Sequence, residues 1–127
     1  MKTVVIYASK LGSTRNVAAH IAGRIGSELV DLKKTQNPDL SGFERIVLGC
    51  GVYAGKPSKR MTAFVKGTDM SGKEVHLFLC CKLKGEKGDD QCEEISEMLG
   101  FPAVYFAGDD KNVPSPAIDE FVKVVSA

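Results

Sequence analysis

Short apolar runs alternate with amphipathic segments along the whole chain. Five runs are typical of buried strands and cover residues 3–7, 28–32, 45–50, 74–80 and 103–107. Apolar residues recur at helical spacing over residues 17–25, 57–66, 89–100 and 116–125. The segment 57–66 carries Pro57 in its expected first turn, where proline is well tolerated. The polar segment 33–42 is expected to hold only a short helix or a loop.

This alternation predicts an α/β fold. Near-continuous apolar strands separated by helices indicate a parallel sheet with helices on both faces. Five strands and about five helices in 127 residues favour a doubly wound five-stranded sheet of order 2-1-3-4-5. We expect a single domain over residues 1–127, because this length suits one core and no linker or repeat interrupts the pattern. In such a sheet a ligand binds beyond the carboxyl ends of the strands, where the loops 9–14, 51–57 and 81–88 are expected to meet.

The first of these loops has the composition of a phosphate site. It reads Ser9, Lys10, Leu11, Gly12, Ser13 and Thr14. Free backbone N–H groups at a helix start, together with three hydroxyls, attract an anion. A nucleotide P-loop is excluded because the loop has one glycine and no lysine after it. The alternative is a plain strand-to-helix turn in which a hydroxyl side chain only caps the helix.

The loop resembles the phosphate loop of flavodoxins, which binds the phosphate of FMN with the pattern S/T-x-S/T-G-x-T. Ser9, Gly12 and Thr14 match this pattern, whereas Leu11 stands where the family usually has a hydroxyl. The resemblance implies a flavodoxin-like fold and FMN as the cofactor.

The second loop suits a flat aromatic ring. We predict contacts to FMN from Gly51, Val52, Tyr53, Ala54 and Gly55, with Tyr53 stacked on the ring. The stretch is also similar to the menaquinone-dependent protoporphyrinogen oxidase type of flavodoxin-like domain, which has a Gly-x-x-x-Tyr-x-Gly loop before a short helix ending in Phe-Val, here Phe64 and Val65. Residues 49–54 formally satisfy a dinucleotide pattern, but they follow the third strand, which disfavours that interpretation. A surface tyrosine is the alternative for Tyr53.

The third loop is expected to cover the other face of the ring through Cys81, Lys82 and Leu83. It departs from the flavodoxin pattern because it has no aromatic residue, so either Leu83 or a lysine stem covers the ring or this face stays open. The neighbouring Cys80 is expected in the core. No residue is assigned to catalysis or to a metal, and the four cysteines are interpreted as reduced thiols.

Charge and hydropathy restrict the partners. The net charge of +1 does not indicate nucleic-acid binding, and no apolar run has the roughly 18 residues of a membrane span. No leader-like segment precedes the first strand, so we expect a cytoplasmic protein. The second and third loops are rich in cations, which either solvate the loops or steer an acidic redox partner: Lys56, Lys59, Arg60, Lys82, Lys84 and Lys87.

These features predict an FMN-binding electron-transfer protein that works with a reductase and an acceptor, or with a quinone. An electron carrier is favoured over an enzyme; an enzymatic form would be an FMN-dependent oxidoreductase of the quinone or protoporphyrinogen type. The second class of function is a flavin-free interaction module on the same fold. A phospho-receiver is disfavoured because the ends of the first and third strands carry no aspartate. The oligomeric state is left open.

Overall fold

Strands and helices alternate along the chain in the computed structural model, which describes residues 2–10, 12–82 and 85–127. The elements are β1 (Thr3–Ala8), α1 (Ser13–Ile25), β2 (Glu28–Asp31), β3 (Arg45–Tyr53), β4 (Lys56–Pro57), α2 (Lys59–Gly67), β5 (Glu74–Cys81), α3 (Gly85–Leu99), β6 (Ala103–Ala107), the 3-10 helix η1 (Gly108–Lys111) and α4 (Pro116–Ser126). Within the described residues there are thus four α-helices and one 3-10 helix, and segment 33–42 contains only turns and bends.

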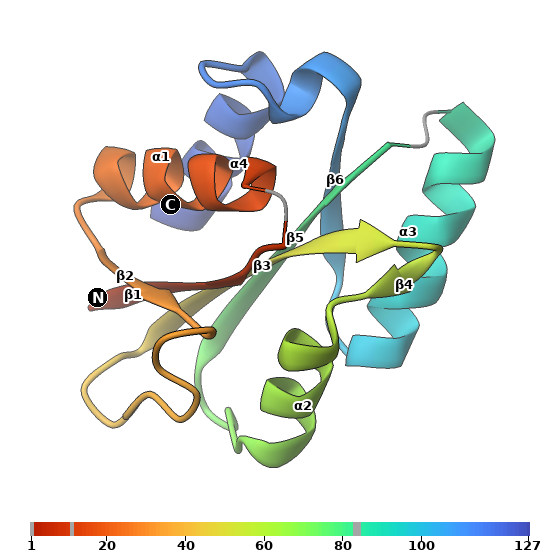
Figure 1. Ribbon diagram of the computed structural model, residues 1–127. Coiled ribbons are helices and arrows are strands. Elements are labelled where there is room, and N and C mark those ends of the chain that lie inside the picture. The colour runs from red at the N-terminus through yellow and green to blue at the C-terminus, as the bar shows by residue number, and fades with distance from the viewer. Residues whose placement is uncertain (1, 11, 83–84) are drawn as a thin grey trace.

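The five main strands form a parallel sheet in the order β2-β1-β3-β5-β6. This confirms the predicted doubly wound order, because the one additional strand among the described residues, β4, is a two-residue antiparallel partner of β3. Helices α1 and α4 cover one face of the sheet and α2 and α3 the other (Figure 1). The carboxyl ends of the parallel strands therefore lie at one edge, as the sequence predicts.

Alternate residues of each central strand enter two separate cores. On β1, Val5 and Tyr7 face the α1 and α4 layer, whereas Val4 and Ile6 face the α2 and α3 layer. This follows from the two-residue period of a strand, and it explains why β1 and β3 are almost continuously apolar after their first residues, Thr3 and Arg45.

Gly49 lies against the core between the sheet and the α1 and α4 layer. A Cβ atom at this position would stand 2.1 Å from the ring of Phe78. Phe78 packs at 5.8 Å from both Phe106 and Phe121, measured between ring centroids. The absent side chain of Gly49 therefore makes room for an aromatic cluster between the sheet and α4.

The chain differs from the sequence prediction after β3. The strand continues to Tyr53, and a tight turn follows in which Ala54 and Gly55 have φ angles of 50° and 76°. Positive φ at both central residues suits the twist of a two-residue hairpin, so Pro57 pairs with Val52 in β4. Helix α2 consequently begins at Lys59, and the prediction that Pro57 occupies its first turn is wrong.

Helix α3 begins at Gly85, four residues before the predicted start. The added first turn reads Gly-Glu-Lys-Gly and contributes no apolar side chain to the core, so hydrophobic spacing did not reveal it. The predicted third loop is shorter than 81–88 for this reason.

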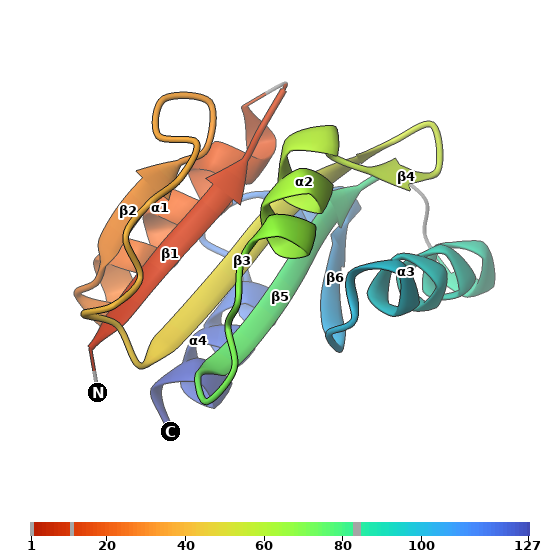
Figure 2. The same ribbon diagram turned by 90° about the horizontal axis from the view of Figure 1, so that it is seen from below.

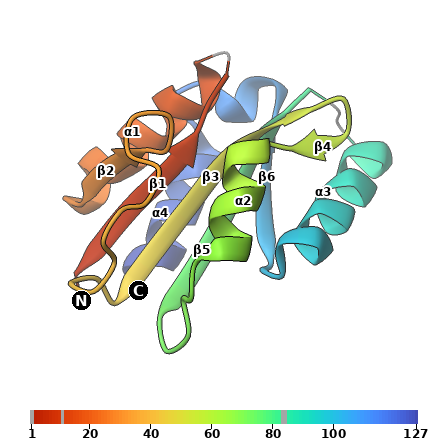
Figure 3. The same ribbon diagram turned by 60° about the horizontal axis from the view of Figure 1, so that its bottom comes forward.

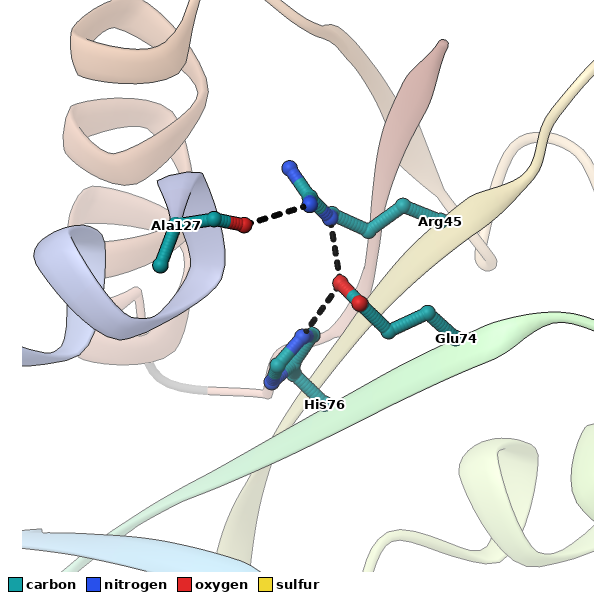
Figure 4. Close-up of polar contacts among 4 residues, drawn as sticks. All are labelled: Arg45, Glu74, His76 and Ala127. Atoms are coloured by element: carbon teal, nitrogen blue, oxygen red, sulfur yellow. Dashed lines mark hydrogen bonds and ion pairs between the residues drawn. The ribbon is translucent and has the colours of Figure 1, made fainter. Parts of the chain in front are cut away.

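An ionic cluster occupies the opposite edge of the sheet, at the start of β3 and β5 (Figure 4). The largely buried guanidinium of Arg45 donates to the carboxylate of Glu74 and, at 3.2 Å, to the carbonyl of Ala127. The Nε2 atom of His76 lies 2.9 Å from the same carboxylate. The hydrogen bonds from His76 and Arg45 lower the pKa of the Glu74 carboxyl below its usual value of 4.5.

We expect Glu74→Gln to lower the free energy of unfolding by about 1 kcal/mol at neutral pH, because the carboxylate is 42% exposed and solvent screens the pair. A depressed folded-state pKa contributes stability above the unfolded value, and this stability is lost as the pH falls below 4.5. Urea unfolding between pH 7 and pH 3 should therefore show a smaller pH dependence for the variant. The exposed neighbour Glu44 gives the control Glu44→Gln, and equal profiles for both variants would contradict the assignment.

Candidate functional site

The loop between β1 and α1 leaves the start of the helix open. Gly12 is the N-cap of α1, with φ 94° and ψ −22°, and no side chain caps the helix. This left-handed conformation is easily adopted by glycine. The amide of Gly12 donates to the Ser9 hydroxyl at 3.1 Å, which folds the loop tightly in front of the helix. The arrangement places the positive end of the α1 dipole at the carboxyl edge of the sheet.

The remaining residues of this loop differ in exposure. Lys10 is exposed and Ser13 is half-buried. Thr14 is buried, and its hydroxyl hydrogen-bonds with the thiol of Cys80, so it also ties the loop to β5. Leu11, the predicted departure from the flavodoxin pattern, lies outside the described residues.

Tyr53 joins the second predicted loop to the first. Its hydroxyl accepts a 2.8 Å hydrogen bond from the backbone amide of Lys10, and the Lys10 Nζ atom lies 5.7 Å from its ring centroid. The phenol folds back over Gly51, where a Cβ atom would be 2.6 Å from the hydroxyl. The ring therefore lies at the loop between β1 and α1, and its hydroxyl accepts a hydrogen bond from one of the backbone amides of that loop.

The other residues predicted from the second loop belong to the β3–β4 hairpin. Gly51 is buried, Val52 is half-buried, and Ala54 and Gly55 form the exposed turn. The hairpin tip lies beside α3, because a Cβ atom on Gly55 would be 3.4 Å from the side-chain amide of Gln91.

The third predicted segment is mostly strand end. Cys81 is the last residue of β5 and is buried, with its thiol 3.7 Å from the carbonyl of Phe106. Lys82 is exposed, and Leu83 and Lys84 lie outside the described residues. Sequence reasoning missed Lys111, whose Nζ atom donates to the Cys81 carbonyl at 3.1 Å. It comes from η1, which no hydrophobic pattern reveals.

The thiols at this edge are unsuited to nucleophilic chemistry. Burial raises the pKa of Cys50 to about 11 and that of Cys80 to about 12, so both remain protonated near neutral pH. This agrees with the prediction that Cys80 is a core residue.

A cavity of about 840 Å³ opens between the first loop, the hairpin and α2. Ser9, Lys10 and Tyr53 line it, so three predicted site residues from two loops share one hollow. Its volume lies within the range of small-molecule sites. Its other walls are formed by Lys33, Lys56, Pro57, Ser58, Lys59, Arg60, Thr62, Ala63, Lys66 and Met98. The lining therefore combines cations with apolar surface and contains no carboxylate among the described residues. Cys81 and Lys82 are not part of it.

The order of the parallel strands, with helices on both faces of the sheet, defines a doubly wound α/β domain. The family model described as a flavodoxin domain matches residues 4–103, and the chain belongs to this family.

Known proteins support the same fold. Oxidised flavodoxin 2 of Bacillus cereus superposes with a TM-score of 0.72 at 19% identity over 99% of this chain and 98% of that chain. A flavoprotein of Lactobacillus acidophilus NCFM, solved in complex with FMN, gives a TM-score of 0.63 at 22% identity over 88% and 95%. The quinone-type protoporphyrinogen IX dehydrogenase of Escherichia coli K12 is 24% identical over 71 residues. This alignment spans 52% of the present chain and 39% of that relative. Within the described part of the chain, no helix has the length and apolar character needed to cross a membrane.

Proposed function

We propose that the protein binds FMN and transfers electrons. The observation that carries the proposal is the uncapped start of α1, which lies at the carboxyl edge of the sheet directly behind Ser9 and Gly12. A terminal phosphate fits this position because it supplies the acceptor oxygens that the helix amides lack. Membership of the flavodoxin family and the FMN-bound flavoprotein of similar fold point to the same cofactor.

The chain's residues would have separate tasks. Ser9, Ser13, Thr14 and the amides around Gly12 would hold the phosphate. The hairpin and Tyr53 would contact the ring on one side, with Lys82 near the other. FMN supplies the redox chemistry, and the protein supplies binding, orientation and the surrounding charge. If the phosphate accepted a hydrogen bond from the Lys10 amide, the Tyr53 hydroxyl would lose its own hydrogen bond from that amide.

The partners would be redox proteins or a quinone. The quinone alternative is supported by the Escherichia coli relative, which is a quinone-type dehydrogenase. In that case the protein would be an FMN-dependent oxidoreductase rather than a carrier. The flavin-free module stays a competing function, since the Tyr53 hydroxyl already satisfies one amide of the loop.

The proposal predicts that FMN binds at one molecule per chain. Titration of the protein freed of flavin should quench FMN fluorescence and shift the visible spectrum. We expect Ser9→Ala/Thr14→Ala to weaken binding at least about a hundredfold, because two hydrogen bonds to a charged group together contribute roughly 3 kcal/mol or more. Because Thr14 also contacts Cys80, Thr14→Ser is the matched control: it keeps the hydroxyl and should bind like wild type. No FMN binding at high micromolar concentration would contradict the proposal and leave the flavin-free module.

A further inference from the structure

A strip of positive charge follows the outer side of α2. Lys59, Arg60 and Lys66 are exposed on this helix, and Lys56 is exposed just before it. The strip continues across the 840 Å³ cavity, which has no acidic residue in its described lining.

A strip of negative charge follows α3 in the same layer. Its exposed carboxylates are those of Glu86, Asp89, Asp90, Glu93, Glu94 and Glu97, against one exposed lysine, Lys87. The core side of α3 is occupied instead by Cys92, Ile95 and Leu99, so helical spacing turns most of the carboxylates to solvent.

Within the described residues, the charges of both strips form no ion pair. The four ion pairs among the described residues involve Asp119 or Glu74, and neither belongs to α2 or α3. Helices α2 and α3 pack side by side against one face of the sheet (Figures 2 and 3). Their opposite charges nevertheless form no ion pair with each other among the described residues.

We propose that this face binds a second copy of the chain. A two-fold axis running between α2 and α3, along the helices, would place each basic strip on the partner copy's acidic strip. The same contact would then be made twice, as a self-complementary two-fold interface requires. Met98, which is 52% exposed and lines the cavity between the helices, would supply apolar contact near the axis.

A second copy fits this face better than a uniformly acidic protein. An acidic partner that covers α2 would also meet the carboxylates of α3, and like charges across an interface are strongly unfavourable. A basic partner that covers α3 would likewise meet the cations of α2 and be repelled by them. A surface with both signs in the same arrangement avoids both repulsions.

The test is sedimentation equilibrium of the full chain at about 20 mM and about 500 mM NaCl. We expect wild type to dimerise at low salt and to dissociate at high salt, where screening shortens the reach of exposed charges. Lys59→Glu/Arg60→Glu and Glu93→Lys/Glu97→Lys should each weaken the dimer at least tenfold, because symmetry applies every reversal twice. An equimolar mixture of the two variants should form a heterodimer again, since the reversed residues of one copy then face reversed residues of opposite sign on the other copy.

Restored association in the mixture also shows that both variants are folded. The control reversals Lys123→Glu and Glu28→Lys, which lie on α4 and β2 away from this face, should leave the dimer unchanged. A monomer at low salt and high micromolar concentration would overturn the proposal. A dimer insensitive to the α2 and α3 reversals would overturn it too, as would a mixture that stays monomeric. The measurements use the protein freed of flavin, so none of these results depends on whether FMN binds.

Discussion

Gly49→Ala is expected to destabilise the fold by about 3 kcal/mol, at the upper end of what overpacking a core costs. The added methyl group would stand 2.1 Å from the Phe78 ring, a distance that requires the ring or the strand to move. Phe78 has little freedom to move, because it is fully buried and packs against Phe106 and Phe121. Urea unfolding of wild type and variant measures the difference.

Two further variants isolate the cause of this loss. Gly23→Ala lies on the exposed side of α1 with no atom within 4 Å of the new Cβ, so it should raise stability by up to about 1 kcal/mol. Phe78→Leu in the Gly49→Ala background should recover part of the lost stability by freeing space at the collision. If the double variant is less stable than wild type by the full sum of the two single effects, the two sites do not interact and the contact is wrong.

FMN is expected to bind at least about a hundredfold more tightly than riboflavin. The two molecules share the ring and differ by the phosphate, which the proposed site would hold with hydroxyls and with the open amides of α1. Each hydrogen bond to a charged group contributes about 1.5–3 kcal/mol, so two such bonds already exceed this ratio. Parallel fluorescence titrations with the two flavins give the value.

The variant Ser9→Ala/Thr14→Ala separates phosphate binding from ring binding. We expect its affinity for FMN to fall and its affinity for riboflavin to stay within about twofold, because the hydroxyls would not reach the ring. Equal wild-type affinities for FMN and riboflavin would show that the loop after β1 does not hold a phosphate.

The hydrophobic pattern predicted the strands of the sheet well, and it predicted the ends of the helices and strands less well. Five apolar runs marked the five main strands, because the central strands β1, β3 and β5 are largely buried on both faces of the sheet. The hairpin after β3 escaped detection, since Ala54 adopts a positive φ that its residue type does not announce. The start of α3 escaped because its first turn places no apolar side chain in the core.

The candidate site was also predicted only in part from the sequence. Ser9, Gly12 and Thr14 were identified from composition and spacing, because a phosphate loop is built from consecutive residues. The contact between Tyr53 and the Lys10 amide joins positions 43 residues apart, and the Lys111 contact with Cys81 joins positions 30 apart. Such pairings depend on strand register and on side-chain direction, neither of which a linear pattern contains.

The sequence by itself thus determined the α/β class, the strand order, the family resemblance and the position of the first candidate loop, which follows β1. These properties follow from the short-range hydrophobic pattern and from the motif residues Ser9, Gly12 and Thr14 in the first loop. Only the tertiary structure decided where Tyr53 lies, which cations share a cavity, and that a basic α2 stands beside an acidic α3. Those depend on distances between segments remote in the chain, which packing of helices on the sheet sets.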